Sequence, residues 1–381
     1  MHDKKIGVQR IPSLESLGKS FEDASFQGRN VGLANKIFKE MADSGTTIFL
    51  TLAGAITPTG LGGMIIEAME LGFIDIVVST GANLTHDIHF ALNTPLFKCN
   101  PERIDDIELR NKNMERIYDI ILHPSCLTKT AEFIRSVLRK YGHTGPRLIS
   151  TAEFNYWIGK EIYKNSPYPN RSVLAKAYES EIPIYTPSPG DSELGMNCAL
   201  FELDSMIAND INGLPTINPN LDVNELTALT ISCEKTGTIV VGGGAPKNFT
   251  TQVYPYILEE FIYPGIKRDF PDFIKRQPSD INGHDCMIKI TTDSPYYGGC
   301  SGASSSENTA WKKINPKSLD KDEVTVHADA TIILPILFSH VKANCKKRNL
   351  KRLYKKRPEC LKTLAQIREK RVAVLGYEPL R

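Results

Sequence analysis

The sequence predicts an α/β protein with a Rossmann-like, mostly parallel sheet, helices on both faces and helical elaborations. Two observations predict this fold. Short apolar runs rich in β-branched residues alternate with helical segments, and each run is followed by Gly, Ser, Thr or Asp. Parallel sheets of this kind bind ligands outside the carboxyl ends of their strands, so a nucleotide-sized ligand is expected there.

The strands of this sheet are expected in one domain that covers residues 45–345. Each is short and apolar. The expected strands are Thr46–Leu52, Ile74–Ser79, Ile182–Tyr185, Thr238–Val241, Cys286–Thr292 and Val324–His327. Helices are expected at Gly63–Leu71 after the first strand, through His89 after the second, from Leu194 after the third and over 331–342 after the last, and a run of three glycines follows the fourth. Between residues 95 and 180 the alternation of strands and helices is interrupted. That segment is interpreted as a helical elaboration of the same domain, with helices at Asp105–Ile121, Thr128–Tyr141 and Thr151–Lys164.

The two ends of the chain are expected to lie outside this domain. Residues 1–44 are polar and predict an N-terminal helical extension with a helix at Asn35–Met41. Residues 346–381 carry a cluster of Lys and Arg before Pro358. Because the whole chain has a net charge of only +2, a solvated basic helix or tail is favoured there over a nucleic-acid or membrane surface.

Composition and cysteine usage exclude several classes of protein. The eight cysteines lie far apart with no C-x-x-C pair, which indicates free thiols in a reducing compartment. No apolar run resembles a signal peptide or a membrane span. His86 and His89 have no further ligands at usable spacing, so no metal site is expected. We therefore expect a cytoplasmic protein that binds neither membrane nor nucleic acid.

The stretch Tyr297–Ile314 carries the most distinctive chemistry. It begins with glycines that allow close backbone approach to a ligand, and it ends with Trp311 two positions before Lys313. Glu307 precedes Trp311 by four residues, so a helical turn would place both on one face. A lysine beside an aromatic wall and one carboxylate is a candidate imine-forming nucleophile, provided that partial desolvation lowers its pKa. The alternative is a surface loop that runs into an ordinary helix with two solvated lysines.

The residues that could bind a nucleotide form a less specific pattern than the stretch Tyr297–Ile314. The fingerprint G-x-G-x-x-G is absent, and the glycines 242–244 are only a fragment of it. Asp329 and Asp191, each at a strand end, could bind ribose hydroxyls, although either could equally be a helix N-cap. Cys300 is favoured as a small side chain in a crowded loop over a nucleophile, because no nearby His is specified by the sequence.

Together these pieces resemble deoxyhypusine synthase over roughly residues 35–345. The chain is most similar to the bacterial deoxyhypusine-synthase-like branch, some members of which are homospermidine synthases. The matching segments agree with that family in order and spacing. They are Pro187 to Asp191 with Leu194 and Gly195, Gly242 to Gly244 with Lys247, Ser301 to Ala303, Glu307, Trp311 to Ile314, and Val326 to Ala330.

The resemblance implies roles for individual residues. Lys313 matches the imine-forming lysine of the family, and Glu307 and Trp311 match residues of its polyamine site. The positions that contact NAD in the family are Gly54, Thr80, Gly81, Asp191, Gly243, Thr292, Asp329 and Ala330. The resemblance also implies a homotetramer whose NAD sites are completed by two subunits.

This chain departs from the protein-modifying members of the family at several polar positions. Three acidic residues and a glutamate are replaced by Met196, Tyr297, Cys300 and His86, and a histidine is replaced by Asn248. Each lost carboxylate removes a charge-assisted contact to an ammonium, worth about 1.5–3 kcal/mol in a dry site. The candidate substrate contacts are Asn197, Asn248, Cys300 and His86. The identities of the donor and acceptor amines stay open.

The expected function is an NAD-dependent aminobutyl transferase. It would move a 4-aminobutyl group from a polyamine (spermidine or putrescine) through a Schiff base on Lys313 to an acceptor amine, and would form homospermidine when the acceptor is putrescine. One alternative is deoxyhypusine synthesis on a lysine of a translation factor. Others are a net polyamine oxidoreductase and a non-catalytic polyamine-binding protein.

Overall fold

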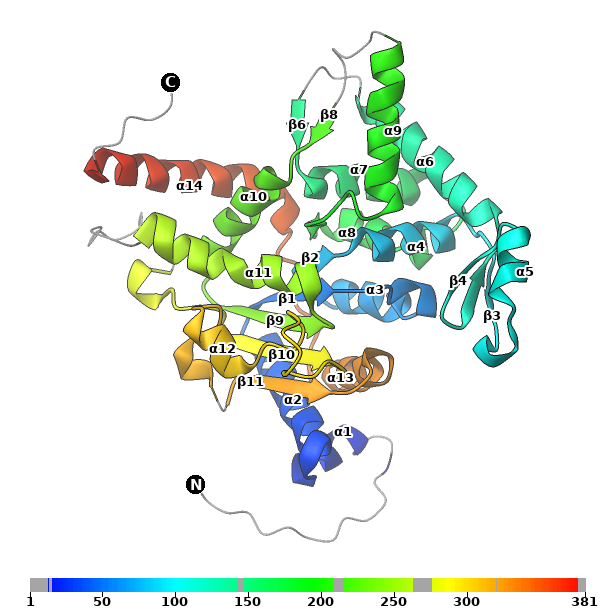
Figure 1. Ribbon diagram of the computed structural model, residues 1–381. Coiled ribbons are helices and arrows are strands. Elements are labelled where there is room, and N and C mark those ends of the chain that lie inside the picture. Colours follow the sequence, from blue (N-terminus) through cyan, green and yellow to red (C-terminus); the bar gives the residue numbers. More distant parts are fainter. Residues whose placement is uncertain are drawn as a thin grey trace.

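A six-stranded sheet forms the centre of the molecule (Figure 1). The computed structural model describes residues 13, 16–142, 147–208, 215–262, 276–319 and 321–375. All neighbouring strands of the sheet are parallel. Across the sheet, the order is β11 (Glu323–His327), β10 (Cys286–Thr291), β9 (Thr236–Val241), β1 (Thr47–Leu52), β2 (Ile76–Ser79) and β7 (Ile184–Tyr185). The predicted Rossmann-like α/β fold is confirmed.

The winding of the sheet changes direction between β1 and β9. From β1 the chain proceeds outward to β2 and β7, and from β9 it proceeds outward on the other side to β10 and β11. Doubly wound sheets have a ligand crevice at such a switch point, outside the carboxyl ends of the strands. The loops that follow β1 and β9 therefore flank the place where a ligand is expected.

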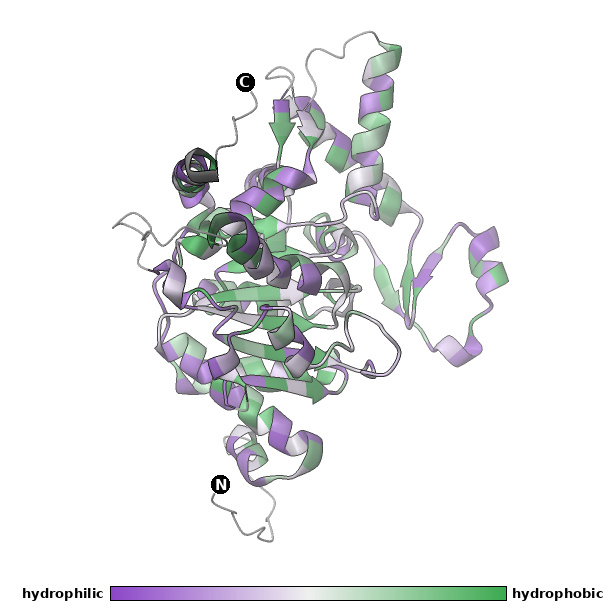
Figure 2. Cartoon of the chain, turned by 60° about the vertical axis from the view of Figure 1, so that its left-hand side comes forward, coloured by the Kyte–Doolittle hydropathy of each residue, from purple (hydrophilic) through white to green (hydrophobic). Residues whose placement is uncertain are grey.

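Alternate residues of each strand face two different helical layers. On β1, Leu50 packs into one core cluster and Phe49 into the other. The first layer includes α2 (Phe26–Asp43), α3 (Gly62–Glu70) and α13 (Ala330–Asn344), and the second includes α10 (Pro219–Ile231), α11 (Gly244–Ile257) and α14 (Leu353–Leu375). Figure 2 shows the hydrophobic strands of the sheet in green between these layers. Burial on both faces explains why the strands are continuously apolar and not alternating.

Most of the remaining elements lie on the β2–β7 side of the sheet, whereas α1 (Leu17–Ser20) and α12 (Ser305–Ala310) lie on the β10–β11 side. The expected helices before residue 95 and after residue 121 are present with adjusted ends, and α2 is longer than the predicted Asn35–Met41. The further elements are α4 (Gly81–Ala91), α5 (Asp106–Asn111), α6 (Ser125–Gly142), α7 (Thr151–Asn165), α8 (Val173–Ser180), α9 (Glu193–Ile207), and the short strands β3 (Leu96–Lys98), β4 (Glu115–Ile117), β5 (Ile120–Leu122), β6 (Arg147–Ile149) and β8 (Pro215–Ile217).

The predicted helix Asp105–Ile121 is wrong beyond Asn111. After α5 the chain forms β4 and β5, which pair antiparallel and join β3 in a three-stranded sheet. The reason lies in two residues with positive φ: Asn113 (53°) ends the helical turn, and Tyr118 (50°) makes the tight turn between β4 and β5. Left-handed backbone is incompatible with a continuing right-handed helix.

The C-terminal helix α14 packs onto the second helical layer. Leu353, Leu364 and Ile367 of this helix are buried in the same core cluster as α10 and α11. Arg357 donates to Glu225 of α10 (2.6 Å) and to Ser150 (3.0 Å), and both charged side chains are nearly buried. Across the described ranges, none of the helices combines the length and apolar character that a bilayer crossing requires.

Candidate active site at the strand ends

Lys313 lies beside Asn248 and Trp311. Its half-buried amine donates a hydrogen bond to Oδ1 of Asn248 on α11 (2.7 Å), and Nζ is 5.8 Å from the centre of the Trp311 ring. Trp311 follows α12 directly and is more than half exposed at 59%. The lysine is therefore held by a neutral amide and walled on one side by an aromatic ring.

The end of α12 explains why Lys313 points inward. Lys312 has a left-handed backbone (φ 60°), its N–H donates to Thr309 O (2.8 Å), and the N–H of Lys313 donates to Asn308 O (2.8 Å). This pair of bonds is the Schellman motif that ends many helices. It reverses the chain immediately after the exposed Trp311 and Lys312, and so fixes where the side chain of Lys313 begins.

Burial makes the amine of Lys313 easier to deprotonate. Desolvation lowers the pKa of Lys313 below its ordinary value, and the acidic groups of Cys300 and Glu307 act in the opposite direction. Both of those residues are thus close enough to influence the pKa of the amine electrostatically. The structure brings together five predicted site residues, which are Lys313, Trp311, Glu307, Asn248 and Cys300.

Two more lysines lie under the loop that precedes α12. Lys247 of α11 donates to Cys300 O (2.8 Å), and Lys289 of β10 donates to Ala303 O (2.6 Å). Their exposed fractions are only 3% and 2%. Burial, followed by the neighbouring charges of Lys289 and Lys313, lowers the pKa of Lys247 to about 8. The three amines therefore form one cluster.

Lys289 was missed as a functional residue by reasoning from the sequence. Burial also lowers its pKa, against the nearby carboxylates of Glu323, Glu307 and Asp293. The available signal was a single lysine inside the apolar strand Cys286–Thr291. Lysine is almost never fully buried unless it is paired, so a lysine in such a strand indicates a specific polar partner.

The loops at the switch point leave open backbone next to the strand ends. Gly54, which follows β1, has φ 62° and no atom within 4 Å of the position a Cβ would occupy. Thr80 caps α4 and donates its hydroxyl to Gly54 O (2.7 Å), so these two positions and the adjacent Gly81 lie together. At Gly243 a Cβ would meet Ser301 at 2.3 Å, which brings the loops after β9 and β10 into contact. Open backbone at strand ends fits the close approach of a pyrophosphate.

The other predicted cofactor positions follow strands at both sides of the sheet. Thr292 follows β10, and Asp329 and Ala330 follow its neighbour β11. Asp329 is the N-cap of α13, since its Oδ1 accepts from the N–H (2.7 Å) and the hydroxyl (2.6 Å) of Thr331. Asp191 lies in the loop after β7, at the opposite edge. The capping role considered for Asp329 is thus observed.

His86 and Asn197 have partners away from Lys313. On α4, Nδ1 of His86 is 3.4 Å from Nδ1 of His89, and burial lowers the pKa of His86 to about 4. On α9, Asn197 accepts from Arg135 of α6 (2.8 Å) and donates to Glu193 O (2.8 Å). These two predicted substrate contacts belong to the packing among α4, α6 and α9.

Comparisons with known proteins identify the family of this chain. The family model for deoxyhypusine synthase matches residues 16–341. A "Deoxyhypusine synthase-like protein" from Thermosynechococcus vestitus is 39% identical and covers 88% of this chain and 79% of that protein. "Probable deoxyhypusine synthase 1" from Archaeoglobus fulgidus is 33% identical and covers 89% and 97%.

A solved structure shares the fold. The Entamoeba histolytica protein, provisionally named a deoxyhypusine synthase, superposes with a TM-score of 0.52 at 17% identity, over 89% of this chain and 96% of that one. At this identity the likeness concerns the fold alone. The family match over most of the chain and the relatives above 30% identity carry the assignment. This chain belongs to the deoxyhypusine synthase family, a family of transferases.

Proposed function

We propose that this protein is an NAD-dependent aminobutyl transferase that works through a Schiff base on Lys313. It would take a 4-aminobutyl group from a polyamine, spermidine or putrescine, and pass it to an acceptor amine. The observation that carries the proposal is the half-buried Lys313 amine, which contacts a neutral amide and has a lowered pKa. A lowered pKa increases the fraction of the neutral amine, which is the form that is nucleophilic toward an imine.

The residues around the switch point would hold the cofactor. Open backbone at Gly54, the capped N-terminus of α4 at Thr80 and Gly81, and the contact of Gly243 with Ser301 suit a dinucleotide with its pyrophosphate at the strand ends. Asp191, Thr292, Asp329 and Ala330 are the further candidates. When bound, NAD would supply the oxidation and the later reduction at the carbon next to the reacting nitrogen.

The chain itself would supply the transfer chemistry. Neutral Lys313 adds to the imine carbon of the oxidised polyamine, and the amine fragment leaves with a proton as the lysine becomes the Schiff base. The acceptor amine then adds to the same carbon, and Lys313 leaves as the free amine. Glu307 would hold a substrate ammonium or move the proton in these steps, and Trp311 would exclude water from the reacting carbon.

A small diamine is our first choice of acceptor, with homospermidine as the product from putrescine. The support is the loss of strongly ionised contacts, since the amide of Asn248 stands where the protein-modifying members of the family have a histidine, and the weakly acidic thiol of Cys300 stands where they have an acidic residue. The runner-up is a lysine of a translation factor, which the name of the Archaeoglobus fulgidus relative favours. Both acceptors would use the same Schiff base.

Borohydride trapping with labelled spermidine and NAD tests the proposal directly. Label is expected on the peptide that contains Lys313 and is expected to be absent from the Lys313→Ala variant. Adding putrescine should yield homospermidine by polyamine chromatography. Label that enters a protein substrate instead would favour the runner-up. Accumulation of NADH with free aminoaldehyde, or no trapping at all, would contradict the transferase.

A further inference from the structure

The side chain of Asn83 is buried against the loop that follows β1. Asn83 lies in the first turn of α4, and its exposed fraction is 0%. Its Oδ1 accepts from the backbone N–H groups of Ile56 (2.6 Å) and Thr57 (3.1 Å). Its Nδ2 donates to Thr80 Oγ1 (3.0 Å) and to the backbone O of Leu52 (3.4 Å). The amide therefore uses both of its donor hydrogens and both acceptor sites of its oxygen.

These bonds hold the loop after β1 on both sides of Gly54. Leu52 precedes Gly54 in the chain and Ile56 follows it, and both are bonded to the same amide. Thr80 adds a link to Gly54 itself, because its hydroxyl accepts from Asn83 and donates to Gly54 O (2.7 Å). Gly54 has φ 62°, and a glycine has many other conformations open to it unless its neighbours are held. One buried side chain thus fixes the backbone at which the pyrophosphate is proposed to bind.

Two further contacts join the start of α4 to its neighbouring loops. The hydroxyl of Thr57 donates to the backbone O of Asn83 (2.6 Å), so the loop and the helix are bonded in both directions. At Gly81 a Cβ would collide with Ser192, which places the loop after β7, with Asp191, against the first turn of α4. The loops after β1, β2 and β7 therefore meet around this one helical turn.

We propose that Asn83 is a positioning residue for NAD, which holds the loop after β1 in one conformation before the cofactor binds. This inference rests on the proposed function and adds a residue that acts through Gly54 and Thr80. A ligand that binds backbone already held in place does not have to order it, and its affinity is higher for that reason. Without the amide, the N–H groups of Ile56 and Thr57 lose their partner and the loop gains conformations that bind NAD poorly.

The test measures the affinity of the cofactor-free full chain for NAD by calorimetry. Asn83→Ala should weaken NAD binding by at least about tenfold, because binding must then order the loop. Asn83→Ser has a smaller polar side chain that can keep one of the hydrogen bonds, so it should recover part of the loss. The serine variant also carries the test if the alanine variant does not fold.

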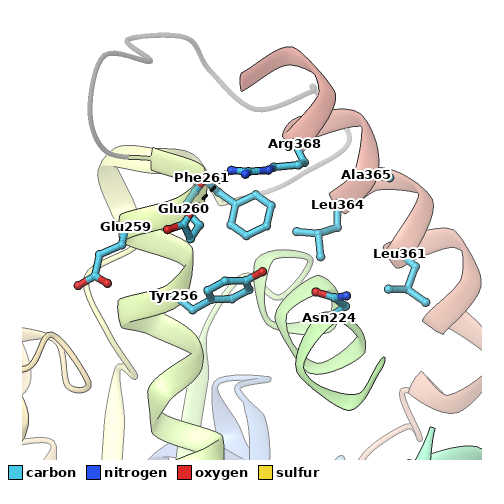
Figure 3. A pocket seen from close by; sticks show the side chains of 9 residues that line it. All are labelled: Asn224, Tyr256, Glu259, Glu260, Phe261, Leu361, Leu364, Ala365 and Arg368. Atoms are coloured by element: carbon cyan, nitrogen blue, oxygen red, sulfur yellow. Dashed lines mark hydrogen bonds and ion pairs between the residues drawn. The ribbon is translucent and has the colours of Figure 1, made fainter. Parts of the chain in front are cut away.

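Two other asparagines serve as controls. Asn35 of α2 is equally buried and donates to Gly18 O (3.2 Å), so Asn35→Ala should lower the free energy of unfolding but change NAD affinity less than about twofold. Asn224 of α10 is exposed and lines a hollow of about 450 Å³ between α10, α11 and α14 (Figure 3). None of the described residues that line this hollow belongs to α4, and Asn224→Ala should change neither quantity.

Hydrogen exchange separates the positioning of the loop from a general loss of stability. Without NAD, the backbone N–H groups of Ile56 and Thr57 should exchange faster in Asn83→Ala than in the wild type, and added NAD should restore their protection. Unchanged NAD affinity in Asn83→Ala, or an equal loss of affinity in Asn35→Ala, would overturn this inference and leave the proposed function standing. A wild type that binds no NAD would overturn both.

Discussion

At the scale of single residues, the pKa of Lys313 is set by a balance of burial against nearby acids. Desolvation lowers its pKa, while Cys300 and Glu307 raise it. The bond to Asn248 adds no charge to this balance, because an amide oxygen accepts without being ionised. The pKa of Lys313 is therefore set mainly by how much water reaches the amine, with Cys300 and then Glu307 acting against this desolvation.

The first prediction concerns the pH dependence of Schiff-base formation in Glu307→Gln. The neutral amine reacts, so the trapping rate rises with pH through the pKa of Lys313. Without the carboxylate, the ammonium loses a stabilising neighbour and the pKa falls, so the rise should begin at lower pH than in the wild type. Half-saturation by spermidine should increase about three- to tenfold. Glu108→Gln on α5 is the control, and a rise displaced to higher pH would contradict this account.

At the scale of elements, the loop before α12 is anchored by hydrogen bonds from Lys247 and Lys289. Each lysine donates to a carbonyl of that loop, at Cys300 and at Ala303. Glu307, Trp311 and Lys313 all follow this loop in the chain, so their positions depend on it. Buried lysines here act as positioning residues for the residues proposed to do the chemistry.

The second prediction is that Lys289→Met separates activity from stability. Methionine has similar length and removes a buried charge, so the free energy of unfolding should fall by no more than about 2 kcal/mol. The Ala303 carbonyl loses its donor and the loop loses its tether, so the trapping rate should fall at least tenfold. Urea unfolding and trapping measure the two effects. The exposed Lys317→Met should change neither, and full trapping by Lys289→Met would refute the positioning role.

The central sheet could be predicted from the sequence, and its details could not. The strands after residue 45 are recognisable because a sheet buried on both faces needs continuous apolar runs, as in Thr47–Leu52. The segment Asp105–Ile121 misled because its apolar residues fit a helix, and only the left-handed Asn113 and Tyr118 turn it into a hairpin. Such positions are decided by tertiary contacts with β3, which local spacing does not encode.

Some contacts of the candidate site could be predicted from the sequence, and others could not. Lys313, Glu307 and Trp311 are close in sequence, so their proximity could be predicted. Asn248 reaches Lys313 from α11, and that contact depends on the pairing of β9 with β10. His86 and Asn197 were grouped with the site by resemblance, whereas their contacts in this structure are with His89 and with Arg135.

At the scale of the whole molecule, α14 and α9 differ in what they do with their apolar residues, because α14 buries them and α9 exposes them. The C-terminal helix closes one face of the core through Leu353, Leu364 and Ile367. On another side, α9 exposes a row of large apolar residues, which are Met196, Leu200, Leu203, Met206 and Ile207. An exposed apolar patch of this kind is typical of an interface, as expected for the homotetramer that the family resemblance implies.

The third prediction compares two arginines of α14. Arg357 and Glu225 are about nine-tenths buried, so Arg357→Met leaves a buried unpaired carboxylate and should lower the free energy of unfolding by about 3–5 kcal/mol. Arg368→Met on the same helix breaks a pair that is nearly half exposed and should cost less than about 1 kcal/mol. Denaturant unfolding measures both. Similar losses for the two variants would show that burial does not govern these pairs.

The fourth prediction concerns assembly through α9. Leu203, with 52% of its surface exposed, lies in the middle of the apolar row. Leu203→Glu places a charge where a partner surface would bury it, so size-exclusion chromatography with light scattering should show a smaller species than the wild type. Asp204→Asn, the next position, should leave the assembly intact. A wild-type chain that already elutes as a monomer would exclude the tetramer.

The switch point between β1 and β9 also has a consequence for how the protein is made. These two strands pair along their whole length although they are about 190 residues apart in the chain. At about 5–20 residues per second, a ribosome needs on the order of ten to forty seconds to complete β9 after β1 has emerged. During that interval β1 can pair only with β2, and its other side is an open, apolar sheet edge. Nascent chains arrested before β9 should therefore aggregate or recruit chaperones, and those arrested well beyond it should not.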